Sequence, residues 1–191
     1  TCDAKGIAAA MMTAAERLAA EGEERVDLLF VVGEERGSDG ARMANQLPAT
    51  SRFLINGEPT ESNLATGTKG ALRVLLRTKG REAHSAYAEL GDSAITPMMR
   101  LLLEVDALEL PTDPVLGTST VNVGLIKGGT GANIVPGSCE AELMIRVVGD
   151  PEPVRNAVDA WVGGRAEVSY PAYTPAQRFH DVPGFPAKVF A

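Results

Sequence analysis

The order of patterned segments between residues 66 and 170 limits the fold of this chain more than any other feature. Some segments alternate apolar and polar residues or are rich in β-formers, as strands do, and others carry apolar residues at helical spacing. The strand pattern covers 66–77, 119–127, 139–148 and 166–170, and the helical pattern covers 92–108 and 151–162. The order β-α-β-β-α-β predicts a four-stranded antiparallel sheet with two helices on one face, the ferredoxin-like arrangement.

The first sixty residues follow a different plan. An apolar stripe of Ala, Met and Leu predicts a helix over 4–21, and a second short helix is expected over 38–47. The apolar run VDLLFVV at 26–32 and the segment 52–56 are typical of strands buried on both faces. Helices alternating with such strands predict a parallel α/β sheet, so we expect the chain to divide near residues 60–68.

Composition excludes several classes of partner. The 18 basic and 25 acidic side chains give a net charge of -7, and the basic residues are scattered singly, which argues against nucleic-acid and membrane-surface binding. No apolar run approaches the ~20 residues that span a bilayer. Cys2 and Cys139 form neither a disulfide framework nor a metal motif, and we expect two reduced thiols in a cytoplasmic protein.

Four carboxylates stand at positions where ligands gather in open α/β sheets. Asp3 precedes the first helix, while Glu34, Glu35 and Glu58 follow the two expected strands. Such a group can bind a cation and leave one carboxylate free as a general base. The alternatives are ordinary surface acids, with Asp3 a helix cap and Glu58 a turn residue. Oxygen-only ligands also permit a calcium or magnesium site.

Six motifs resemble a known family over nearly the whole chain. In order along the sequence they are CDAKG (2–6), FVVGEERGSDGA (30–41), NGEPT (56–60), GREAHSA (80–86), GANIVP (131–136) and MIR (144–146). They are similar to motifs of the dinuclear-zinc amidohydrolases and metallopeptidases that include acetylornithine deacetylase, succinyl-diaminopimelate desuccinylase and the carboxypeptidase G group. The resemblance implies a partial catalytic α/β domain at 1–63, a ferredoxin-like lid and dimerisation domain at 64–171, and a return to the catalytic domain at 172–191.

The resemblance also implies roles for the carboxylates. Asp3 would bridge two zinc ions, Glu35 and Glu58 would each be a ligand of one zinc, and Glu34 would be the general base. Cobalt or manganese are alternatives to zinc. Two cations that share a carboxylate lower the pKa of bound water, which makes the arrangement chemically coherent.

Further roles fall on the expected lid domain. His84 would reach the active site of a neighbouring subunit and stabilise the oxyanion there, and Asn133 and Arg146 would contact substrate. The helix at 92–108 and the strand at 66–77 would supply the surface of a homodimer.

Two departures from the family pattern affect the expected metal site. The family's His-x-Asp motif precedes the Asp-x-Lys-Gly block, and here Asp3 is the third residue, so we expect an internal segment of a longer enzyme. His180 is the only later histidine, and we expect it to be an ordinary loop residue rather than a zinc ligand.

Together these features predict a metal-dependent hydrolase that cleaves an N-acyl amide or peptide bond of a small carboxylate-bearing substrate. The alternative is a catalytically incomplete binding or dimerisation module of the same fold.

Overall fold

The structure, a computed structural model, describes residues 2–48, 51–61, 63–65 and 67–178. It divides into two compact units, of which the first ends at Leu64 and the second begins at Ala65. Within the described ranges, no helix has both the length and the apolar character needed to cross a membrane.

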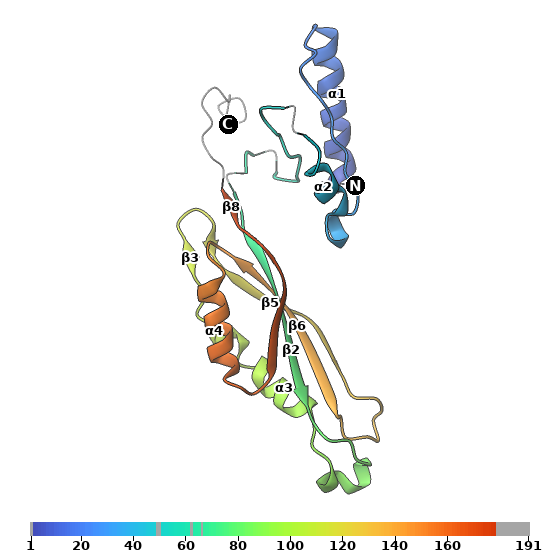
Figure 1. Cartoon of the computed structure of the whole chain (residues 1–191), viewed down its shortest axis with the longest axis vertical. Coiled ribbons are helices and arrows are strands. Elements are labelled where there is room, and N and C mark those ends of the chain that lie inside the picture. The colour runs from blue at the N-terminus through green and yellow to red at the C-terminus, as the bar shows by residue number, and fades with distance from the viewer. Residues whose placement is uncertain (1, 49–50, 62, 66, 179–191) are drawn as a thin grey trace. The chain divides into compact units, whose positions relative to one another are not determined.

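The second unit is built on one antiparallel sheet. Its strands are β2 (Gly70–Lys79), β5 (Thr120–Gly128), β6 (Ser138–Val147) and β7 (Glu167–Thr174), in the spatial order β5-β6-β2-β7. Two helices, α3 (Ile95–Leu102) and α4 (Glu152–Val162), connect them (Figure 1). This confirms the predicted β-α-β-β-α-β order and the ferredoxin-like sheet.

Shorter elements complete the second unit. They are β1 (Gly67–Thr68), which pairs with β8 (Gln177–Arg178), β3 (Thr112–Asp113), which pairs with β4 (Gly117–Thr118), and two 3-10 helices, η3 (Ser85–Leu90) and η4 (Val105–Ala107). The helix expected over 92–108 is therefore shorter, because α3 ends at Leu102 and η4 follows as a separate turn.

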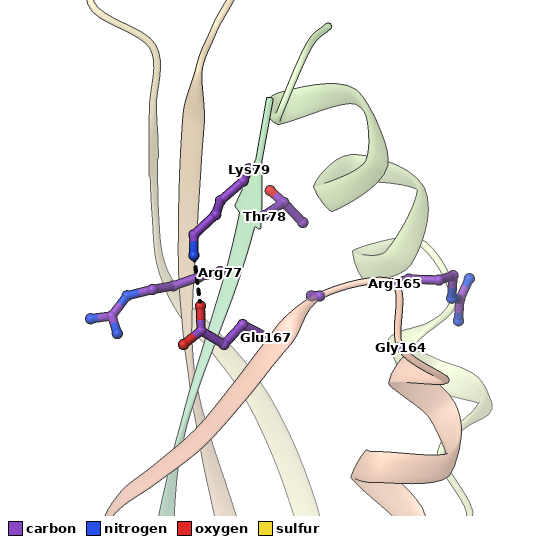
Figure 2. A pocket seen from close by; sticks show the side chains of 7 residues that line it. Arg77, Thr78, Lys79, Gly164, Arg165 and Glu167 are labelled. Carbon is purple, nitrogen blue, oxygen red and sulfur yellow. Dashed lines mark ion pairs between the residues drawn. The ribbon is translucent and has the colours of Figure 1, made fainter. Parts of the chain in front are cut away.

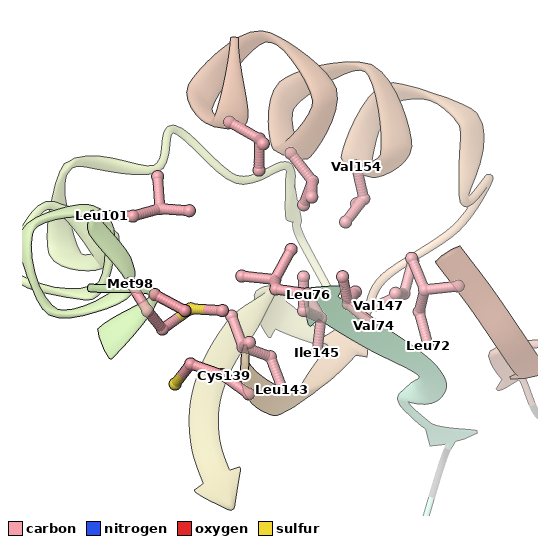
Figure 3. Packing of buried hydrophobic residues seen from close by; sticks show 14 residues of the cluster. Leu72, Val74, Leu76, Met98, Leu101, Cys139, Leu143, Ile145, Val147 and Val154 are labelled. Carbon is pink, nitrogen blue, oxygen red and sulfur yellow. The ribbon is translucent and has the colours of Figure 1, made fainter. Parts of the chain in front are cut away.

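The hydrophobic core lies between the helices and one face of the sheet. Alternate residues of β2 and β6 are buried there, including Leu76 and Leu143, which are fully inaccessible. Figure 3 shows Met98 and Leu101 of α3 and Val154 of α4 packed onto that face. The period-2 pattern seen in the sequence is thus the pattern of a sheet covered on one side.

The opposite face of the sheet carries paired charges. Arg73 donates twice to the carboxylate of Glu142, at 2.6 Å each, and Arg77 donates to Glu140 at 2.8 Å. The hydrogen bond from Arg73 lowers the pKa of the Glu142 carboxyl below its usual value. Charge pairs across neighbouring strands suit a face that meets water.

The sheet order leaves β5 and β7 at its edges. Along β5 the side chains of Val123, Leu125 and Ile126 are 37%, 52% and 50% exposed. The strand expected over 66–77 as part of a dimer surface corresponds to β2, which pairs with β6 and β7 along its two sides. Because a strand paired on both sides has no free edge, β2 could contribute to a dimer surface only through its side chains, and that expectation stays a prediction.

The first unit contains helices but no sheet among its described residues. Its elements are a π-helical turn η1 (Cys2–Gly6), α1 (Ile7–Ala20), a 3-10 turn η2 (Glu34–Arg36) and α2 (Asp39–Ala44). Gly6, rather than Asp3, stands at the N-cap of α1, so Asp3 is not the helix cap that the sequence left open.

The strands expected over 26–32 and 52–56 are not formed. Neither segment has a hydrogen-bonded partner strand, and their apolar side chains are exposed, with Val32 at 77% and Leu54 at 82%. A strand of this length is stable only beside other strands, and the local sequence cannot supply those neighbours.

The last long strand of the second unit is longer than expected. The last long strand, β7, continues to Thr174, and β8 follows at Gln177–Arg178, whereas the expected strand ended at residue 170. His180 and the remainder of the expected return segment lie outside the described residues.

Candidate functional site

Two loops at one end of the sheet are joined into a single structure. The loop after β2 carries His84, and the loop between β5 and β6 carries Asn133. The backbone N–H of Ser85 donates to the carbonyl oxygen of Asn133 at 2.9 Å, and the N–H of Val135 donates to Ala83 at 2.8 Å. The structure therefore brings together two of the predicted site residues, which are 49 positions apart in the sequence.

Glycine allows these loops to approach closely. A Cβ atom at Gly91 would lie 2.8 Å from Cγ1 of Val135 and 3.0 Å from Cβ of Ala83, closer than real side chains pack. The GREAHSA and GANIVP motifs thus meet through the backbone, and a side chain at Gly91 would separate them.

The imidazole of His84 is held by its own loop. Its Nδ1 atom accepts a hydrogen bond from the backbone N–H of Ala86 at 3.2 Å, and its ring centroid lies 6.5 Å from that of Tyr87. The His84 side chain is exposed, and Tyr87 is 61% exposed. The sequence analysis predicted His84 as a site residue but did not predict its contacts with Ala86 and Tyr87. The contact with Ala86 is made by a backbone N–H, so the residue type at position 86 gives no indication of it.

Arg146 lies far from this pair within one chain. It stands near the end of β6, opposite Ala71 of β2 and Thr120 of β5, whereas β6 begins at Ser138 beside the joined loops. At about 3.3 Å per residue, Ser138 and Arg146 are about 26 Å apart. The structure therefore does not place Arg146 beside His84 and Asn133 in the same subunit.

The four predicted carboxylates are exposed in the first unit. Asp3 lies in η1, and Glu34 and Glu35 lie in η2. Glu58 lies in an extended segment, where its Oε1 accepts a hydrogen bond from Nδ2 of Asn56 at 3.3 Å. The neighbouring Gly57 packs against α1, because a Cβ there would lie 2.5 Å from Cγ2 of Ile7.

The described carboxylates do not form a metal site. No three His, Cys, Asp or Glu side chains in the described part of the chain are grouped so that they could hold a metal ion. All the predicted donors are carboxylates, whereas zinc in proteins prefers imidazole or thiolate in its donor set. The described residues by themselves therefore do not complete a site for a pair of zinc ions, and no chemical step is derived from one.

A pocket of about 370 Å³ lies elsewhere on the second unit, lined by Arg77–Lys79 and Gly164–Glu167 (Figure 2). Each basic side chain that lines this pocket is paired with a carboxylate. Lys79 lies 3.5 Å from Glu167, Arg77 donates to Glu140, and Arg165 lies 2.8 Å from Glu104. None of the predicted site residues lines it, so it is separate from the His84 site.

Comparison with known proteins agrees with this architecture. Residues 66–168 match the family model described as the peptidase dimerisation domain, M20 type. Over its full length the chain is 39% identical to a peptidase M20 domain-containing protein of Schizosaccharomyces pombe, covering 49% of that protein. A protein of Aspergillus fumigatus named "probable carboxypeptidase" is 39% identical over 97% of this chain and 48% of its own length. The chain thus spans about half the length of these relatives.

Solved structures show the same fold at lower identity. A tripeptidase from Staphylococcus aureus has a TM-score of 0.59 and 23% identity, covering 81% of this chain and 43% of its own. The aminopeptidase PepT from Bacillus cereus has a TM-score of 0.56 and 21% identity over the same shares. Residues 66–168 thus form a peptidase dimerisation domain. The chain belongs to the M20 peptidase family.

Proposed function

We propose that this chain belongs to a hydrolase that cleaves an N-acyl amide or peptide bond of a small carboxylate-bearing substrate. The observation that carries the proposal is the junction of the His84 and Asn133 loops at one end of the dimerisation domain, where Ser85 N–H donates to Asn133 and His84 is bridged to Ile134. The names of the relatives from Schizosaccharomyces pombe and Aspergillus fumigatus support a peptidase or carboxypeptidase reaction.

The proposed residue roles follow the motif resemblance. Glu34 accepts a proton from the attacking water and passes it to the leaving amine. His84 donates a hydrogen bond to the oxygen on which negative charge develops, and Asn133 and Arg146 hold the substrate, with the guanidinium suited to its carboxylate. Asp3, Glu35 and Glu58 are proposed as zinc ligands, although imidazole donors beyond the described residues are needed to complete such a site.

A homodimer follows from the same domain. Of the two edges of the sheet, β7 contains Pro171, which has no N–H to donate, whereas β5 exposes Val123, Leu125 and Ile126. We propose that two copies pair through β5. A two-fold axis makes such strands antiparallel, so the His84 end of one sheet adjoins the Arg146 end of the other. This arrangement accounts for a site that uses residues from opposite ends of the sheet in one chain.

The alternative is a binding or dimerisation module without catalysis. It is favoured by the described carboxylates, which do not group as metal ligands. Metal content and hydrolysis of N-acetyl amino acids discriminate between the two functions. A stable dimer without turnover or bound zinc favours the module, and turnover with bound zinc favours the hydrolase.

The Glu34→Gln variant tests the roles of the adjacent glutamates. In the completed enzyme, the hydrolase proposal expects this variant to keep the metal content of the wild type and to lose turnover by several orders of magnitude, because only the proton acceptor is removed. The matched Glu35→Gln variant should lose metal. The reverse result would exchange the two roles.

A further inference from the structure

The loop that carries His84 fixes the imidazole in one hydrogen-bonding state. A backbone N–H can only donate a hydrogen bond, and the Ala86 N–H points to Nδ1 of His84 at 3.2 Å. Nδ1 must therefore present a lone pair. In the neutral ring the proton then resides on Nε2, because one nitrogen of a neutral imidazole carries hydrogen and the other accepts it.

We propose that the Ala86 backbone amide is a positioning group that holds His84 as the Nε2–H tautomer. The exposed nitrogen of the imidazole is then always a donor and never a proton acceptor. The ligand group that fits it is an acceptor oxygen, such as a carbonyl or a developing oxyanion. This use of the donor rests on the proposed hydrolase function, whereas the tautomer itself is a property of the chain alone.

Backbone hydrogen bonds around His84 hold the Ala86 amide and the His84 imidazole in place relative to each other. Residues on both sides of His84 are bonded to the neighbouring loop, Ala83 to Val135 and Ser85 to Asn133. Tyr87 N–H donates to the carbonyl oxygen of His84 at 2.8 Å, which closes the turn that contains Ala86. The donor direction is therefore set by backbone bonds, and the side chain at position 86 contributes nothing to it.

Nitrogen NMR of the imidazole tests the proposal directly. The chain contains only His84 and His180, so long-range ¹H–¹⁵N spectra of the labelled 191-residue protein give two ring patterns, and a His180→Gln variant assigns them. Above pH 8 the His84 Nδ1 shift should be that of an unprotonated nitrogen and the Nε2 shift that of a protonated one. A protonated Nδ1 would overturn the proposal.

Two variants separate the amide from the side chain. Ala86→Pro removes the N–H and should move both His84 nitrogen shifts toward those of the urea-unfolded chain, while Ala86→Gly keeps the N–H and should leave them unchanged. If Ala86→Pro does not fold, the comparison of folded and urea-unfolded wild-type protein decides alone. Identical shifts in those two states would mean that the amide imposes no preference. None of these measurements requires turnover. The tautomer proposal can therefore be refuted while the hydrolase proposal stands, and the hydrolase proposal can be refuted while the tautomer proposal stands.

Discussion

The hydroxyl of Thr78 donates a hydrogen bond to the carbonyl oxygen of Ala94 at 2.7 Å in the buried interior of the second unit. Thr78 is near the end of β2 and Ala94 immediately precedes α3, so this bond spans the base of the loop that carries His84. The Ala94 N–H in turn donates to Pro136 in the loop that carries Asn133. The two candidate site loops are thus tied at their base as well as near His84.

Replacing Thr78 with Val should destabilise the protein by about 1–3 kcal/mol, because the Ala94 carbonyl loses a buried partner at nearly constant side-chain volume. Urea unfolding measures the change. Thr120→Val, at an exposed position of β5, is the matched control and should shift the unfolding midpoint little. Equal effects at the two positions would show that the buried hydrogen bond has no special importance.

Acid should weaken the sheet through Glu142. Arg73 lowers the pKa of Glu142 in the folded protein, so the pair stabilises the fold above the unfolded pKa of about 4.5 and loses that effect as pH falls through the lower folded value. Urea midpoints of wild type and Glu142→Gln should therefore differ at pH 7 and converge as the pH falls through the lowered folded pKa of Glu142. Arg73→Gln should reproduce the Glu142→Gln profile. A difference that persists at low pH would show that the substitution acts through packing.

A charge on the β5 edge should dissociate the proposed dimer. Leu125→Lys places like charges near each other across the two-fold axis and removes apolar contact, so we expect a shift toward monomer in sedimentation velocity. Ala172→Lys on the opposite edge strand, β7, is the control and should leave the association unchanged. Dissociation by Ala172→Lys alone would assign the interface to β7.

Mixed dimers test whether one site uses residues of both subunits. His84→Ala and Arg146→Ala should each lower turnover by about 10²–10³-fold, the effect of losing a transition-state donor. In a random mixture, heterodimers hold one site with both residues intact, which restores about a quarter of wild-type activity. Activity that stays at the level of the separate variants would place both residues in the site of a single subunit.

The order of strands and helices in the second unit could be predicted from sequence because short-range apolar patterns identify each of these elements. Buried and less buried side chains alternate along β2 and β6 because helices cover one face of the sheet, so the local pattern was enough to predict that Leu72, Val74 and Leu76 are buried. The His84 and Asn133 loops were predicted as separate motifs. Their junction could not be predicted, because it depends on backbone hydrogen bonds between residues of arbitrary type.

The first unit shows where this reasoning ends. Residues 26–32 have the composition of a buried strand, yet Phe30 is 60% exposed and no ladder forms. The apolar composition of residues 26–32 favours burial. The segment is buried only when neighbouring strands cover it, and the local sequence pattern does not specify those strands. The metal-ligand roles of Asp3, Glu35 and Glu58 rest on the motif resemblance and stay a prediction.

Because helices cover only one face of the sheet, enclosed and more accessible residues alternate along β2 and β6. On β2 the even-numbered residues from Leu72 to Thr78 are enclosed, and on β6 the odd-numbered residues from Cys139 to Val147 are enclosed. Polar substitutions should therefore be tolerated at every second position of β2 and β6, and should be harmful at the enclosed positions between them. The enclosed positions of the two strands lie directly opposite each other, since the antiparallel register pairs Leu72 with Ile145 and Val74 with Leu143.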